Sequence, residues 1–79
     1  MKRCIVFQPA GVGDILFLQK IVTRLVTEGY EVIYPLLPEL MYVKEYLDTS
    51  GVTYVSVGEK ITGEVDKFFN FRDVNYQYP

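Results

Sequence analysis

The chain has 79 residues, 49% of them hydrophobic and 23% charged, which is the composition of an ordinary globular protein. With a net charge of −2 and no histidine, it offers neither a basic surface for nucleic acid nor a set of residues for a metal site. No apolar run is long enough for a membrane span, no signal peptide is recognisable, and the single cysteine excludes an internal disulfide, so a cytoplasmic location is predicted.

The chain opens with a pattern of strand, glycine turn and helix. The apolar run CIVF at positions 4–7 predicts a strand over residues 3–8, buried on both faces as in a central parallel strand. Cys4 fits there as a small buried side chain rather than a reactive thiol. The turn QPAGVGD follows at positions 8–14, and a helix is predicted from position 13 or 14 to 28, capped by Gly29. Its core stripe is Leu18, Ile21, Val22 and Leu25.

A second strand and a second helix come next. The strand is predicted over residues 31–34, ended by Pro35 because proline cannot donate to a ladder. Pro38 is well placed at the start of a helix over residues 39–49, with Gly51 as its cap. The inward residues of this helix are predicted to be Leu40, Val43, Tyr46 and Leu47.

Two further strands are predicted, over residues 52–57 and 65–71, with a polar turn between them at 58–63. Because residues 58–64 are too few for a helical parallel crossover, the sequence leaves the orientation of the fourth strand open, and an antiparallel hairpin with the third strand is one arrangement that it allows. The aromatic residues favour a core role over a stacking platform for single-stranded nucleic acid, since a basic groove is missing. Those with core-facing periodicity are Phe7, Phe17, Tyr46 and Phe68.

These elements predict an α/β protein: a Rossmann-like β-α-β-α-β unit with a largely parallel sheet and a possible fourth strand. If strand order moves steadily outward, right-handed crossovers put both helices on one sheet face and leave the other bare. We therefore expect an incomplete domain, with residues 1–79 as the N-terminal portion and a second domain absent. That domain, or a self-association partner, would cover the bare face.

The glycine turn departs from both common phosphate-binding motifs. A dinucleotide fingerprint would need a third glycine where Leu16 stands and an acidic residue after the second strand, which ends in Tyr34 and Pro35. A P-loop would need a lysine followed by serine or threonine after Gly13, where Asp14 and Ile15 stand. The sequence therefore predicts no nucleotide cofactor.

Asp14 allows two interpretations. A carboxylate at a helix start on the carboxyl edge of a parallel sheet faces the crevice where ligands bind, and it could accept a proton from a sugar hydroxyl. It could instead serve only the helix dipole, a contribution of about 0.3–1 kcal/mol. On spacing alone the dipole role is favoured, because aspartate is common at helix starts.

The run from position 4 to about 25, with Pro9, Gly11, Gly13 and Asp14, resembles the amino terminus of the lipopolysaccharide heptosyltransferase family, the ADP-heptose glycosyltransferases built from two Rossmann domains. Residues 66–71 are similar to a later strand of that family, which leads to an acceptor-side loop, here near residues 72–75. The resemblance implies transfer of a heptose or hexose from a nucleotide sugar to an acceptor hydroxyl on a glycan or lipid-linked molecule. Asp14 would be the general base, and the substrates would lie against Gly11, Val12 and Gly13.

Two departures from the family limit this expectation. The connection before the fourth strand is shorter than in family members, and the second domain, which holds most of the nucleotide-sugar site, is absent. We therefore expect the 79 residues alone to be inactive. The alternative is a non-enzymatic Rossmann-like module that binds a phosphorylated small molecule or a protein partner.

Overall fold

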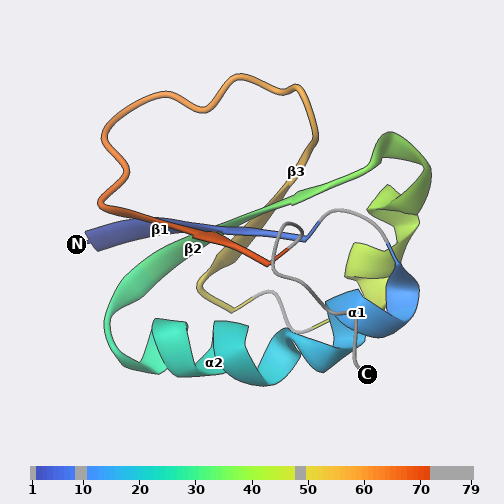
Figure 1. The fold of residues 1–79 in the computed structure, drawn as a ribbon, viewed down its shortest axis with the longest axis horizontal. Coiled ribbons are helices and arrows are strands. Elements are labelled where there is room, and N and C mark those ends of the chain that lie inside the picture. The colour runs from blue at the N-terminus through green and yellow to red at the C-terminus, as the bar shows by residue number, and fades with distance from the viewer. Residues whose placement is uncertain (1, 9–10, 48–49, 72–79) are drawn as a thin grey trace, which may run out of the picture.

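The structure is a computed structural model that describes residues 2–8, 11–47 and 50–71 (Figure 1). Its four strands form one parallel sheet in the order β3-β2-β1-β4. The strands are β1 (Lys2–Phe7), β2 (Tyr30–Leu36), β3 (Val52–Ser56) and β4 (Lys67–Asn70). The helices are α1 (Val12–Phe17), α2 (Gln19–Thr27) and the 3₁₀ helix η1 (Pro38–Tyr46). The predicted α/β class and Rossmann-like parallel sheet are confirmed, and the strand order matches the first four strands of a doubly wound fold.

The core lies between the sheet and the helices, with α2 running beneath the strands in Figure 1. Side chains at alternate positions of the strands point to this layer, as strand geometry requires. The strand residues of the core are Cys4, Val6, Val32, Tyr34, Leu36 and Tyr54, and the helical residues are Ile15, Leu18, Val22, Leu25 and Val43. Most of the predicted stripe is thus confirmed, and Ile21 packs against its edge.

The sequence pattern predicted one continuous first helix, but the structure has two shorter ones. The division lies at Leu18, where α1 ends and α2 begins. Ile15 and Leu18 are buried, so Phe17, two positions after Ile15, points to the opposite side of α1 and is 73% exposed. The prediction that Phe17 belongs to the core is therefore wrong. Gly29 does end α2, with a φ of 98°.

The second helix is a 3₁₀ helix that ends at Tyr46, not an α-helix that reaches residue 49. Pro38 begins it as predicted, and Val43 is buried. Tyr46 is its last residue and is 80% exposed, so its predicted inward position is wrong. Gly51 is not a helix cap. Its φ of 76° turns the chain close to α2, and a Cβ there would lie 2.7 Å from a methyl of Val26.

Strand β2 continues through Pro35, which was predicted to end it. The carbonyl of Leu36 accepts a 2.8 Å hydrogen bond from Val57 N–H, so the backbone polar groups of Leu36 point toward β3. Those of the preceding Pro35 therefore point toward β1, because they alternate along a strand. The pairing of β2 with β1 stops at Ile33. Proline is tolerated because the N–H that it lacks would point beyond the last pair of that ladder.

Strand β4 is not the antiparallel partner of β3. It lies parallel to β1 on the side away from β2. The connecting residues 57–66 contain no helix and cross the sheet face opposite α2, the orange segment above the strands in Figure 1. Ten extended residues reach roughly 33 Å, enough to cross three strand spacings of about 4.8 Å while returning along a five-residue strand. The connections from β1 to β2 and from β2 to β3 move across the sheet in one direction, and the connection from β3 to β4 moves back in the other. For all of them to be right-handed, the last must cross the sheet face opposite the helices.

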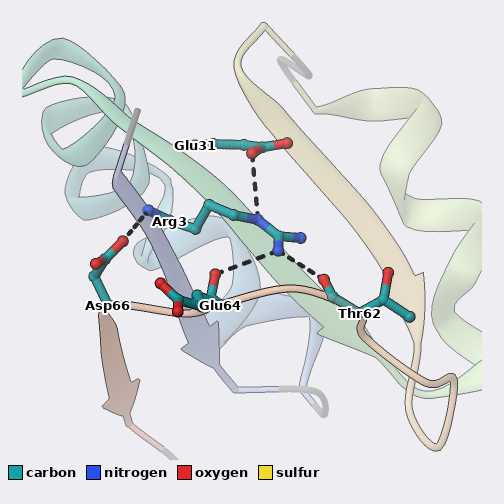
Figure 2. A network of polar contacts seen from close by, with 5 residues as sticks. All are labelled: Arg3, Glu31, Thr62, Glu64 and Asp66. Carbon is teal, nitrogen blue, oxygen red and sulfur yellow. Dashed lines mark hydrogen bonds and ion pairs between the residues drawn. The ribbon is translucent and has the colours of Figure 1, made fainter.

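The second sheet face is therefore not wholly bare. Arg3 binds the crossing segment to it (Figure 2): its Nη1 donates to the carbonyls of Thr62 at 2.7 Å and Glu64 at 3.3 Å. The Arg3 backbone N–H donates to a carboxylate oxygen of Asp66 at 2.8 Å, and Nε lies 3.3 Å from Glu31. Phe68 stays 56% exposed on this face, against its predicted core position. That a second domain or a second copy covers the remainder stays a prediction.

Candidate functional site

The strand order places a topological switch point between β1 and β4. From β1 the chain proceeds to β2 on one side, while β4 is reached by the crossover over the opposite face. In open parallel sheets, ligands bind in the crevice at the carboxyl ends of such strands. The turn that precedes α1 leaves β1 at this edge, and α1 lies at the end of the sheet to which β1 points (Figure 1).

Of the two glycines of the turn, Gly11 has a backbone conformation that requires glycine, and Gly13 does not. Gly11 has a φ of 86°, a region that side chains resist, and a Cβ there would lie 3.0 Å from Oδ2 of Asp14. Gly13 has no such backbone conformation, and nothing lies within 4 Å of the place where its Cβ would be. Gly11 thus shapes the turn, whereas Gly13 leaves open space beside Asp14.

Asp14 lies in the first turn of α1 and is exposed. Within the described residues, no ion pair or hydrogen bond of its carboxylate is found, and it does not cap the helix. Because α1 has only six residues, the dipole that the carboxylate could serve is short. An exposed carboxylate at this edge can accept a proton from a bound hydroxyl.

All four predicted site residues, Gly11, Val12, Gly13 and Asp14, lie together in this exposed turn. Pro9 and the expected acceptor loop at 72–75 lie outside the described residues. On the neighbouring strand, Phe71 N–H donates to the carbonyl of Phe7 at 3.0 Å, which holds the ends of β1 and β4 together. The structure therefore brings the predicted turn to the switch point.

Hydrogen bonds of two tyrosines in the sheet hold the chain on either side of the turn, and the sequence pattern did not predict them. The hydroxyl of Tyr34 donates to the carbonyl of Gln8 at 3.0 Å, and Gln8 is only 4% exposed. Tyr54 donates to Oε1 of Gln19 at 3.4 Å, and Nε2 of Gln19 donates to the carbonyl of Ile15 at 3.3 Å. A tyrosine inside an apolar strand is the signal that could have indicated these bonds, since a buried phenol needs a partner.

Large apolar side chains are exposed on the two helices that follow β1 and β2 at the carboxyl edge. They are Val12, Leu16 and Phe17 on α1, and Tyr42 and Tyr46 on η1. The last two residues of α1 are 51% and 73% exposed, and the two tyrosines are 56% and 80% exposed. Large apolar side chains left exposed are typical of a surface that another part of a protein covers.

Within residues 2–8, 11–47 and 50–71, no group of three potential metal ligands and no helix able to cross a membrane is found. Comparison with known proteins gave no match to any family model, curated protein or solved structure.

Proposed function

We propose that this chain supplies the general base for transfer of a sugar from a nucleotide sugar to an acceptor hydroxyl. The exposed carboxylate of Asp14, at the switch point and without a partner among the described residues, carries the proposal. The sequence resemblance to the heptosyltransferases supports it, with a heptose or hexose as the transferred group. The donor site would lie largely on a second domain across the crevice.

In the proposed reaction the acceptor oxygen attacks the anomeric carbon from the face opposite the leaving nucleotide diphosphate. As the new glycosidic bond forms, Asp14 accepts the hydroxyl proton and the leaving phosphate oxygen takes the electron pair of the broken bond. The configuration at the anomeric carbon is inverted. The backbone at Gly11, Val12 and Gly13 would line the space that the acceptor and the donor phosphates share.

The test is Asp14→Asn in the longest natural reading frame that contains this sequence. Loss of a general base is expected to lower the transfer rate by about 10²–10⁴. Glu39→Gln, which removes an exposed first-turn carboxylate from η1, serves as the matched control. Transfer by Asp14→Asn at the rate of the control would reject the assignment.

The second candidate is a non-enzymatic module that binds a phosphorylated small molecule or a protein partner. The exposed apolar residues of α1 and η1 favour the protein partner, because large apolar side chains left exposed are typical of an interface. A reading frame that ends at Pro79, with a folded product of uniform size, would favour this candidate. A frame that continues for a few hundred residues would favour the enzyme.

A further inference from the structure

The crossing segment encloses a trough on the sheet face opposite the helices. Two cavities of about 180 Å³ each lie between the sheet and residues 57–62. The two cavities are neighbours, since Val55 of β3 and Ile61 of the segment line both. Neither cavity contains a residue of the turn at 11–14, so the trough is a site separate from the one proposed above.

One end of the trough is apolar. Its walls include Ile5 and Phe7 of β1, Pro35 of β2 and Phe68 of β4. The rings of Phe7 and Phe68 are stacked, with centroids 6.0 Å apart and planes at 29°. Phe68 is 56% exposed, so an incoming ring could still cover it. An apolar cavity of about 150 Å³ is known to accept benzene, and this end is of comparable size.

The other end is polar and carries Arg3, Glu31 and Lys60. Glu31 offsets the charge of Arg3, whose Nη1 is also bound to the carbonyl of Thr62. Figure 2 shows Arg3 between these groups, holding the segment to the strands. In the described part of the chain no carboxylate lies within ion-pair distance of Lys60, which therefore gives this end a positive sign.

One negative group stands at the apolar end. Glu59 lies at the rim of that cavity, is exposed, and has Oε1 3.5 Å from Ser56 N–H. The trough is thus negative beside the aromatic pair and positive at Lys60. A ligand whose apolar group enters at the Phe68 end would be favoured if its own charge is negative and placed at the far end.

We propose that the trough binds a small aromatic monocarboxylate, with its ring against Phe7 and Phe68 and its carboxylate directed to Lys60. The segment already lies across the polar end, where two hydrogen bonds from Arg3 hold it, and the space left beneath it there is a cavity of about 180 Å³, the size of a small molecule. Arg3 keeps the segment in place, so the binding space exists before the ligand arrives and costs little ordering.

The probe is 3-phenylpropionate, added to the purified protein with ¹³C-labelled isoleucine and valine methyl groups. The methyl signals of Ile5, Val55 and Ile61 are expected to shift in a saturable manner, with a Kd on the order of 1 mM for a ligand of this size. 3-Phenylpropylamine has the same ring and the opposite charge, and it is expected to bind at least threefold more weakly. Absence of saturable shifts at these methyls, or equal binding of the amine, overturns the proposal.

Variants locate the two ends. Lys60→Gln is expected to weaken phenylpropionate binding threefold or more and to leave amine binding no weaker, because only the carboxylate uses that charge. Phe68→Ser removes the exposed ring and is expected to weaken both ligands. Lys20→Gln on α2 is the matched control with unchanged binding, and dispersed methyl signals verify folding of each variant. Unchanged carboxylate binding by Lys60→Gln, or shifts confined to α1 and η1, would also refute the site.

Discussion

The hydroxyl of Tyr34 in β2 donates to the backbone carbonyl of Gln8, the residue that follows β1. The tyrosine is fully buried, and its ring lies 5.5 Å from that of Tyr54. A side chain of one strand thus fixes the point at which the neighbouring strand turns toward Gly11 and Asp14. The geometry of the candidate site depends on the core beneath it.

Tyr34→Phe should therefore destabilise the protein. The variant keeps the ring and leaves the buried carbonyl of Gln8 without this donor, a loss of about 1–2 kcal/mol in the free energy of unfolding. Urea denaturation measures it. Tyr42→Phe, at an exposed tyrosine, is the control and should be within about 0.5 kcal/mol of the parent. Equal stability of the two variants would show that the bond contributes nothing net.

Gly63→Ala should also destabilise, by about 1 kcal/mol or more. The φ of Gly63 is 89°, and a Cβ there would lie 2.6 Å from Nη1 of Arg3. Gly13 lies inside α1 without a positive φ, and nothing lies within 4 Å of the methyl that alanine would add. Gly13→Ala should therefore raise the free energy of unfolding by about 0.5–1 kcal/mol. Thermal or urea unfolding compares the two.

Part of the Gly63 effect should depend on Arg3. With Arg3→Ala the clash disappears and only the backbone strain remains, so the double variant should lose less than the sum of the single losses. Strict additivity would mean that the guanidinium moves aside at no cost.

Phe17→Ala and Leu18→Ala test where the core ends. Leu18 is 2% exposed, and its truncation should cost about 2–5 kcal/mol. Phe17 is 73% exposed, and its loss should change the free energy of unfolding by less than about 0.5 kcal/mol. A large cost at Phe17 would contradict the division of the helix at Leu18.

Cys4 should make stability depend on alkaline pH. Burial raises the pKa of its thiol above the ordinary value of 9.0, because the thiolate is poorly solvated there. The unfolded chain therefore loses this proton at a lower pH than the folded one. The contribution of the Cys4 thiol to the free energy of unfolding is intact below pH 9.0, and it declines as the pH rises above that value toward the pKa of the folded state. Unfolding free energies between pH 8 and 11 should fall more steeply for the parent than for Cys4→Ala.

Much of the fold could be predicted from local pattern. The apolar run at positions 4–7, the stripe through Leu18, Val22 and Leu25, and the glycine at 29 each act within a few residues. The turn at 11–14 could be placed at the sheet edge for the same reason. The position of the turn in the fold therefore follows from local sequence, without knowledge of the strand order.

The predictions from the sequence were wrong where the local structure depends on residues that are distant in the chain. Pro35 is tolerated only because the β1 ladder has already stopped, which nothing near Pro35 indicates. The direction of β4 depends on its contact with β1, and the segment before it is held by Arg3, about sixty positions away in sequence. Tyr34 looks like any strand aromatic until its partner at Gln8 is known. Connection length alone left the direction of β4 open, since an extended segment replaces the usual helix.

The position of β1 between β2 and β4 also bears on the order of folding. Of the four described strands, β1 is made before the others. One of its neighbours, β2, follows within some thirty residues, whereas the other, β4, pairs Lys67 with Cys4. Closing the longer loop costs only about 0.7 kcal/mol more than closing the shorter one, yet it must wait for synthesis. Until β4 emerges, one hydrogen-bonding edge of the central strand stays open, and during that interval a nascent chain is most prone to pair with another.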